Sequence, residues 1–298
     1  MRVAISMRMH RLENGDVELA ASTEFGPRVL EYRRRGGENV FGRVPETQGV
    51  ETPFGTWHSR GGHRLWHAPE DRVRTYYPDN APVAVRGGTH MVVLTQAVEP
   101  HTLLEKEIAL ELATSGTRVR VTHRIRNRGG FDVELALWAI SVMRPGGCAF
   151  IAQPKYVSHD VELAPARPIV TWPFTQMDDP RFAWGARFIR LRQDPSRSEP
   201  EKIGAYDRAG FVAYASGEDL FVKRHEPQPG AHVDFGCNVE LWVDSGILEA
   251  ETLSPIVRIP PGGEAQHVEV WSLARCDEDL SHASDDVVAA AIDQACVK

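Results

Sequence analysis

The sequence predicts an all-β protein, a large antiparallel β-sandwich with one short helix at the C-terminus. Three observations support this prediction: hydrophobic residues mostly alternate with a period of two, turns rich in glycine and proline recur at short intervals, and a helical pattern is found at the end of the chain. Regularly spaced strands divided by such turns favour a sandwich or barrel over β-α-β units, in which strands alternate with helices.

The alternation is clearest between residues 117 and 127. Three aliphatic residues and His123 alternate there with four arginines and a threonine, so one face should point inward and the other should be cationic and solvated. Further strand-like runs cover residues 17–20, 28–32, 90–96, 104–112, 133–142, 210–215, 220–224, 239–243, 248–253, 257–259 and 265–274.

Two segments depart from this pattern. Residues 165–209 are rich in proline, aspartate, tryptophan and arginine, and they predict a long surface excursion of the kind that often lines sites on β scaffolds. Residues 284–296 begin with Ser-Asp-Asp and continue as an alanine-rich run, which predicts a short terminal helix. No internal repeat or linker divides the chain, so we expect one domain over residues 1–298, with its core at about 15–275.

Composition narrows the class of protein. The 298 residues are 42% hydrophobic and 25% charged, enough for a sizeable core without disulfides or metals. The net charge of −7 and the absence of a long basic run argue against a nucleic-acid partner, and no apolar stretch is long enough to span a membrane. The four cysteines form no C-x-x-C pair and no signal peptide is evident, so we expect a cytoplasmic protein.

Common catalytic motifs are missing from the sequence. It has no G-x-G-x-x-G dinucleotide fingerprint, no phosphate-binding P-loop, no G-x-S-x-G elbow and no H-E-x-x-H. These absences argue against the commonest nucleotide, hydrolase and zinc-protease chemistries, and we expect no cofactor and no metal ion.

The densest group of polar and aromatic residues covers positions 57–70. Trp66 offers an apolar face for sugar C–H groups, while Arg64 and the histidines His63 and His67 offer directed hydrogen bonds, the mixture that a sugar pocket needs. The alternative is a surface loop with its tryptophans anchored in the core. A metal site at the two histidines is a weaker alternative, because Pro69 opposes the helix that would align them.

A second group covers residues 221–251. Lys223 and Arg224 follow one predicted strand, and Glu249 and Glu251 share a face of another. A buried pair of carboxylates costs desolvation energy unless it is paired or used, and like charge would raise the pKa of one member for acid–base work. The alternative places both glutamates on the solvent face, with Leu248 inside.

Three segments, in order, resemble the galactose mutarotase-like superfamily. They are GGHRLWHAPE at 61–70, THRIRNRGGFDVELALWAISVMRPGG at 122–147 and GILEAETLSPIVRIPPGGEAQHVEVWSL at 246–273. The GGHRLW and E-x-E-x-L-x-P motifs are most similar to a branch other than the aldose 1-epimerases proper. The resemblance covers most of residues 15–275 and implies a large antiparallel supersandwich that binds sugar on its concave sheet.

The resemblance also implies site residues. In mutarotases a glutamate removes the proton of the anomeric hydroxyl and a histidine protonates the ring oxygen, which implies Glu251 as the base, with Glu249 next. Mutarotases carry the histidine in the strand after the hairpin, where this chain has Trp138 and no histidine. We therefore expect the proton donor to be His63 or His67.

The function expected from the sequence is carbohydrate binding, with epimerase or mutarotase activity as its catalytic form. The alternatives are a non-catalytic carbohydrate-binding protein and a metal-dependent β-sandwich enzyme. Trp66 and Trp138 are the expected sugar-binding tryptophans, and the alternative for Trp138 is a core residue of its strand. Arg64, Lys223 and Arg224 would suit an acidic or phosphorylated sugar if they face the pocket, and otherwise form surface ion pairs. No pattern in the sequence indicates an oligomeric state.

Overall fold

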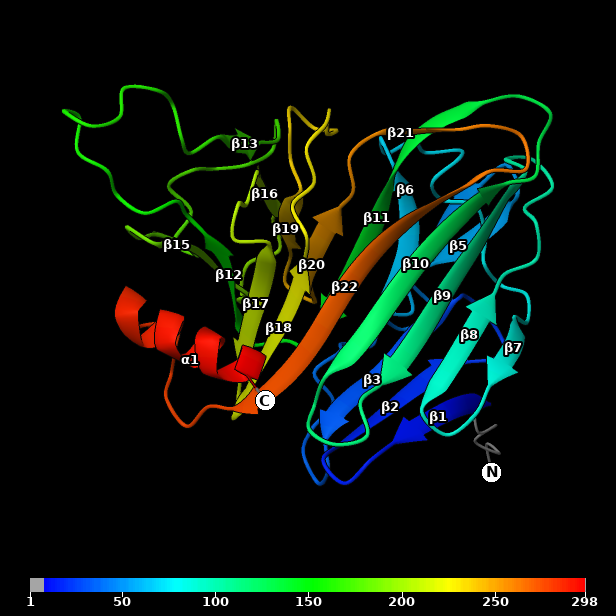
Figure 1. The fold of residues 1–298 in the computed structure, drawn as a ribbon, viewed down its shortest axis with the longest axis horizontal. Helices are drawn as coiled ribbons and strands as arrows, with labels where there is room; N and C mark the ends of the chain where they lie inside the picture. The colour runs from blue at the N-terminus through cyan, green and yellow to red at the C-terminus, as the bar shows by residue number, and fades with distance from the viewer. Residues whose placement is uncertain (1–7, 298) are drawn as a thin grey trace.

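Two large antiparallel sheets packed face to face make up most of the structure (Figure 1). The computed structural model describes residues 8–297, and each sheet has ten strands within that range. In spatial order, the first sheet contains β1 (Met9–Glu13), β2 (Val17–Ser22), β3 (Arg28–Arg34), β6 (His63–Ala68), β11 (Val133–Met143), β20 (Leu248–Leu253), β19 (Val239–Val243), β16 (Glu201–Ala205) and β13 (Ile169–Thr171), with β21 (Val257–Ile259) paired to β11. The second contains β14 (Phe182–Trp184), β15 (Phe188–Arg192), β12 (Cys148–Ala152), β17 (Phe211–Ser216), β18 (Asp219–His225), β22 (Glu264–Arg275), β10 (Val119–Asn127), β9 (Leu104–Leu112), β8 (Met91–Thr95) and β7 (Ala84–Gly87).

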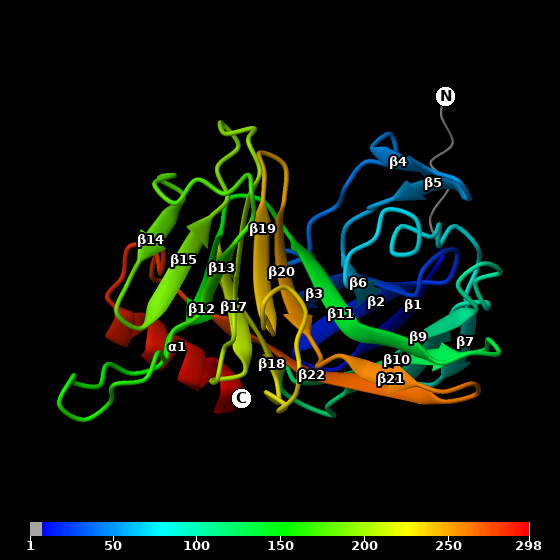
Figure 2. The same ribbon diagram turned by 90° about the horizontal axis from the view of Figure 1, so that it is seen from above.

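A small hairpin lies outside the two main sheets. Strands β4 (Gly49–Thr52) and β5 (Gly55–His58) pair only with each other in the described part of the chain. Figure 2 shows this hairpin on the side of the first sheet that faces away from the second sheet. It therefore adds side chains to the outer face of the first sheet.

The predicted sandwich is confirmed, and β10 shows how period two builds it. Val119, Val121 and Ile125 are buried between the sheets, as their alternation predicts. Two arginines of the opposite face form ion pairs, since Arg124 and Arg126 reach Glu107 at 2.6 and 3.0 Å. Every predicted strand is present, with both ends within two residues of the prediction.

The predicted terminal helix is also present, as α1 (Asp285–Val297). Val288, Ile292 and Ala295 are buried against Phe150 and Val222, so the helix covers the outer face of the second sheet. Among the described residues there is no helix with the length and apolarity needed to cross a membrane.

Residues 165–209 differ from the predicted surface excursion, because they contribute four strands, β13 to β16, to the two sheets. The reason is visible in β16, where every residue is buried. A strand covered on both sides shows no polar alternation, and strands of three to five residues between proline-rich turns give a weak sequence signal.

Candidate functional site

A cleft of about 330 Å³ opens on the outer face of the first sheet. Its lining is strongly aromatic and includes five of the seven tryptophans of the chain. The lining residues are Val50, Trp57, Ser59, Arg64, Trp66, Glu70, Tyr76, Trp138, Trp172, Phe174, Lys202, Trp242, Ile247, Glu249 and Glu251. Cavities of this kind, mostly apolar with a few convergent polar groups, are typical of small-molecule sites.

The strand register builds the aromatic wall of the cleft. Trp66 of β6 lies opposite Trp138 of β11, and the two ring centroids are 5.5 Å apart. Trp57 of the β4–β5 hairpin packs on Trp66 at 4.9 Å, and Tyr76 meets Trp66 at 4.7 Å. Because side chains alternate across a strand, the residues two positions apart on β6 share this face.

Arg64 lies at one end of the wall. Its Nη1 donates to Glu249 Oε1 at 2.8 Å, and its guanidinium lies over the rings of Trp66 and Trp57 at 4.4 and 5.5 Å. The Nε of Arg64 is buried and has no hydrogen-bond partner within the described residues. The arginine is thus held rigidly, with an ion pair on one side and aromatic faces on the other.

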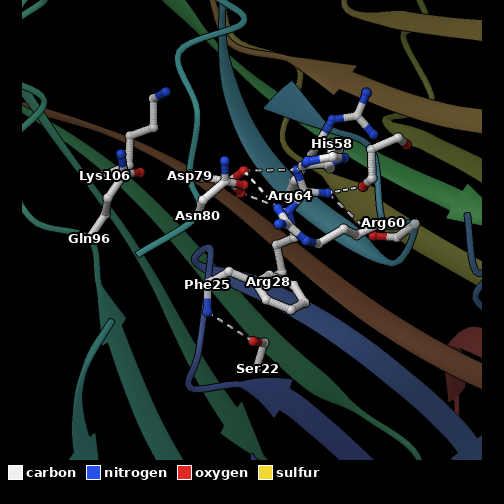
Figure 3. Close-up of polar contacts among 12 residues, drawn as sticks. Ser22, Phe25, Arg28, His58, Arg60, Arg64, Asp79, Asn80, Gln96 and Lys106 are labelled. Carbon is white, nitrogen blue, oxygen red and sulfur yellow. Dashed lines mark hydrogen bonds and ion pairs between the residues drawn. The ribbon is translucent and has the colours of Figure 1, made fainter. Parts of the chain in front are cut away.

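Two further arginines lie behind Arg64, and one of them, Arg28, holds the backbone there. Figure 3 shows Arg28, Arg60 and Arg64 beside Asp79, whose carboxylate accepts from Arg28 Nε at 2.8 Å. Arg28 Nη2 also donates to the carbonyl of His58 at 3.1 Å. These contacts hold the turn that leads from the hairpin into β6.

The glycine pair of the GGHRLW motif is explained by the same turn. Gly61 and Gly62 have φ of 77° and 69°, the left-handed region that favours glycine. A Cβ on Gly61 would lie 2.1 Å from the carbonyl oxygen of Gly42, and one on Gly62 would lie 2.3 Å from that of Val29. The motif therefore places β6 close against its neighbours and so positions Arg64 and Trp66.

A lysine and two glutamates form the floor at the other end of the cleft; Lys202 and Glu251 line the cavity, and Glu240 lies behind them without lining it. Lys202 Nζ lies 2.7 Å from Glu240 Oε2 and 3.4 Å from Glu251 Oε2. Trp138 Nε1 donates to Glu251 Oε2 at 2.8 Å. The ammonium of Lys202 is also flanked by the rings of Trp138 and Trp172, at 4.8 and 4.6 Å.

Burial and the nearby lysine have opposite effects on the pKa values of the two glutamates of the floor. Glu240 of β19 and Glu251 of β20 are paired in register and almost fully buried. Burial raises the pKa of Glu240 well above its usual range; Lys202 opposes this and the charge of Glu251 adds to it. Burial likewise raises the pKa of Glu251, against the pull of Lys202. Two carboxyl groups facing one ammonium favour a state with a single proton on the glutamate pair.

The structure brings together five of the predicted site residues. Glu249, Glu251, Arg64, Trp66 and Trp138 all line the cleft. Glu251 is the more deeply buried of the two glutamates, and Glu249 keeps partial exposure beside Arg64.

His63 and His67 are not part of this group, which corrects their predicted role as the proton donor in the sugar site. Both lie on the opposite face of β6 and point between the sheets, because they occupy the alternate positions to Arg64 and Trp66. His63 contacts His123 at 2.7 Å and Ser141 at 2.9 Å, while burial lowers the pKa of His67 to about 3. Neither ring reaches the cleft.

Lys223 and Arg224 also lie away from the cleft, in contrast to their predicted role. Lys223 is fully buried between the sheets, 3.0 Å from Glu269 Oε1 and 2.9 Å from the carbonyl of Ala139. Arg224 is on the outer face of the second sheet, where its Nε donates to Cys296 Sγ at 2.8 Å. On β18 these neighbours face opposite sides, and neither side is the cleft.

The predicted site lacks three residues that line the cleft, Trp172, Lys202 and Trp242, and it lacks Glu240, which contacts Lys202. Lys202 and Trp172 belong to the segment predicted as an excursion, so their faces could not be assigned. Glu240 and Trp242 could have been found, because in β19 they alternate with Val239, Leu241 and Val243, which are all buried between the sheets.

One group of side chains within the described residues has metal-ligand spacing. The ligand atoms of His63, His123 and Glu269 lie within 4.8 Å of one another, and all three residues are buried. This group lies between the sheets rather than at the cleft, and the ammonium of Lys223 already neutralises Glu269. His123 Nδ1 lies 3.0 Å from the His267 carbonyl, so the ring donates there and accepts from His63 Nε2.

Comparisons with known structures support the fold. A galactose mutarotase-like protein from Lactobacillus casei matches with a TM-score of 0.58 and 11% identity, covering 90% of this chain and 100% of that one. A second one, from Clostridium acetobutylicum, matches with a TM-score of 0.54 and 11% identity, covering 93% and 98%. The chain therefore has the galactose mutarotase-like fold, as its sequence resemblance implied.

A larger protein also contains this fold. A TPR-domain containing protein from Parabacteroides distasonis matches with a TM-score of 0.64 and 13% identity over 93% of this chain, which spans only 49% of that protein. No protein-family model matches the sequence, and no curated protein matches it. At such identities the likeness concerns the fold alone.

Proposed function

We propose that the protein binds an uncharged sugar in the cleft of the first sheet and interconverts its anomers, with Glu251 as the base. The observation that supports this most strongly is the meeting of an aromatic wall with two buried ion pairs in one small cleft. Tryptophan faces suit the C–H surfaces of a pyranose, and the fixed polar groups suit its hydroxyls.

The charges of the cleft favour an uncharged sugar over the acidic or phosphorylated sugar that the sequence suggested. Both lining cations are already paired, Arg64 with Glu249 and Lys202 with Glu251. The lining carries one more carboxylate, Glu70, so its ionised groups sum to a negative charge. A phosphate would have to compete with these carboxylates for its partners.

The environment of Glu251 supports its role as the base. Burial raises the pKa of its carboxyl group, and a carboxylate with a raised pKa is a stronger base. Trp138 Nε1 orients one oxygen of this group at 2.8 Å. The same position is the one implied by the resemblance to the mutarotases.

The experiment is exchange NMR and calorimetry on a panel of neutral aldoses and their 6-phosphates. We expect saturable binding of a neutral aldose and acceleration of its anomer exchange over buffer, both lost for the phosphate. Glu251→Gln should lower the exchange rate about 10²–10⁴-fold with binding kept, whereas the exposed control Glu111→Gln should behave as wild type. Unaltered exchange in Glu251→Gln would overturn the assignment.

Sugar binding without turnover is the second candidate. It is favoured by the absence of a histidine from the lining of the cleft within the described residues. Trp66→Ala should weaken binding about tenfold, ~1.4 kcal/mol, whereas Trp184→Ala, at a partly exposed site on the second sheet, should not. Binding with no acceleration of exchange by wild type would select this candidate.

A further inference from the structure

The floor of the cleft holds more carboxyl groups than one lysine can neutralise. Both oxygens of Glu240 and Oε1 of Glu251 are buried without a hydrogen-bond donor among the described residues, apart from the ion pairs to Lys202. Buried acceptors left in this way are costly, and a proton between the two carboxyl groups relieves them. Lys202 touches both glutamates and also lines the cleft.

We infer that Lys202 is the proton donor to the sugar ring oxygen, in place of the missing histidine, and that Glu240 positions it. This inference rests on the proposed function, because it assigns the second catalytic group of the same reaction. It makes Lys202 a catalytic residue that touches substrate, and Glu240 a positioning residue that acts through Lys202 and Glu251.

The geometry of the sugar allows the acid and the base to lie side by side. The anomeric hydroxyl oxygen and the ring oxygen are both bonded to C1, so the two proton transfers take place at neighbouring atoms. Glu251 Oε2 and Lys202 Nζ are 3.4 Å apart and both border the cleft. One carboxylate and one ammonium at this separation can address both oxygens of C1 together.

All the proton transfers of the reaction take place between the sugar, Glu251 and Lys202. Glu251 takes the proton of the anomeric hydroxyl, the electrons of that O–H bond form the C1 carbonyl, and the bond from C1 to the ring oxygen breaks. Lys202 gives a proton to the ring oxygen and becomes a neutral amine. After C1 rotates, the hydroxyl of the open chain attacks the carbonyl and returns its proton to Lys202, while Glu251 returns its proton to the new anomeric oxygen.

The ion pair also explains why Lys202 can donate. Burial alone would lower the pKa of Lys202, but the attraction of Glu251 and Glu240 outweighs burial and raises it. When Glu251 accepts a proton its charge disappears, so part of this attraction ends in the step that needs Lys202 as an acid. Proton uptake by Glu251 and proton release by Lys202 are therefore coupled.

Because of Glu240, we expect the exchange rate to fall at alkaline pH. Its pKa is raised by burial, against Lys202, with Glu251 and Asp234 adding to the rise. When Glu240 ionises, a second carboxylate holds Lys202, which then donates less readily. The other charged or titratable groups around the floor are Glu249, Glu70, Cys237 and Lys223.

The test compares Lys202→Met, Glu240→Gln and their combination with wild type, using exchange NMR on the neutral aldose that binds best. Lys202→Met should keep sugar binding within a few fold and lower the exchange rate about 10²–10⁴-fold. Glu240→Gln should lower the exchange rate at neutral pH less than Lys202→Met does, because Lys202 loses a contact of 2.7 Å but keeps Glu251, and it should abolish the fall of the rate at higher pH. The exposed control Lys155→Met should match wild type.

Failure of the inference differs from failure of the proposed function. Exchange that falls in Glu251→Gln but not in Lys202→Met overturns Lys202 as the donor and leaves the function standing. An alkaline limb that survives in Glu240→Gln overturns the role of Glu240. If Lys202→Met does not fold, the double variant, which lacks one buried carboxylate as well as the ammonium, gives the same comparison. A wild type that binds no aldose overturns both proposals.

Discussion

Two buried lysine–glutamate pairs are built alike, one on the outer face of the first sheet and the other between the two sheets, on strands of the second. In the cleft, Lys202 pairs with Glu251, whose Oε2 accepts from Trp138 Nε1 at 2.8 Å. Between the sheets, Lys223 pairs with Glu269, whose Oε2 accepts from Trp271 Nε1 at 2.7 Å. The two pairs use the same three residue types, yet only one borders an open cavity.

The difference between the pairs is the balance of charge. Burial would raise the pKa of Glu269, but the ammonium of Lys223 holds it well below its usual range. The cleft pair has a second carboxyl group, Glu240, and there the pKa of both glutamates is raised. A balanced, fully satisfied pair stabilises the fold, whereas a pair with a surplus carboxyl group keeps a proton to exchange.

The largest expected effect is a loss of stability at acidic pH, caused by protonation of four histidines that are buried between the sheets. Burial lowers the pKa of His63, His123, His225 and His267, that of His225 to about 4. Below about pH 6.5 the unfolded chain binds protons that the folded chain refuses, so stability falls as pH falls. Each histidine contributes about 1.4 kcal/mol per pH unit in this window.

Urea unfolding at a series of pH values measures this slope. A free energy of unfolding that drops by several kcal/mol between pH 6.5 and 5 is expected. The matched variant His90→Gln, at an exposed position, should leave the slope unchanged. A flat profile across that range would contradict the placement of four neutral histidines in the interior.

The next largest effect is the loss of the interior ion pair. Lys223→Met leaves Glu269 buried without a counter-charge and should cost ~3–5 kcal/mol of stability. Chemical denaturation at neutral pH measures it, with Lys155→Met as the exposed control. A loss below 1 kcal/mol would mean that the interior does not depend on this pair.

The smallest expected effect has the opposite pH sign and belongs to the cleft. Because the folded-state pKa of Glu240 is raised, its contribution to stability is present at low pH and is lost as pH rises through that pKa. Glu240→Gln should remove this loss, so the variant gains stability relative to wild type at alkaline pH. If the free energies of unfolding of the variant and of wild type differ by the same amount at every pH, Glu240 is not protonated in the folded protein.

The sandwich was predictable because most strands have one polar and one apolar face. The same periodicity predicts the cleft face of β20, where Glu249 and Glu251 share one side. The same alternation in β6 puts His63 and His67 on one face and Arg64 and Trp66 on the other. The position of the two histidines away from the cleft was therefore predictable from the sequence.

Two physical features of the chain explain why Lys202 and its surroundings could not be predicted from the sequence. Lys202 lies in a strand that is buried on both sides, so neither face is marked by polarity. The polar interior is a second reason, because His123, Lys223 and Glu269 place charged and polar types where the pattern predicts apolar ones. Which polar side chains meet inside and which meet in the cleft is decided by the pairing of strands far apart in the chain.

The most direct test of catalysis in the cleft is the anomer exchange rate of a bound neutral aldose. Exchange NMR measures it for wild type, Glu251→Gln and Lys202→Met at neutral pH. Wild type should accelerate the exchange over buffer, and both variants should return toward the buffer rate while they still bind the sugar. Wild-type exchange at the buffer rate, for every aldose that binds, would contradict the catalytic role of the cleft.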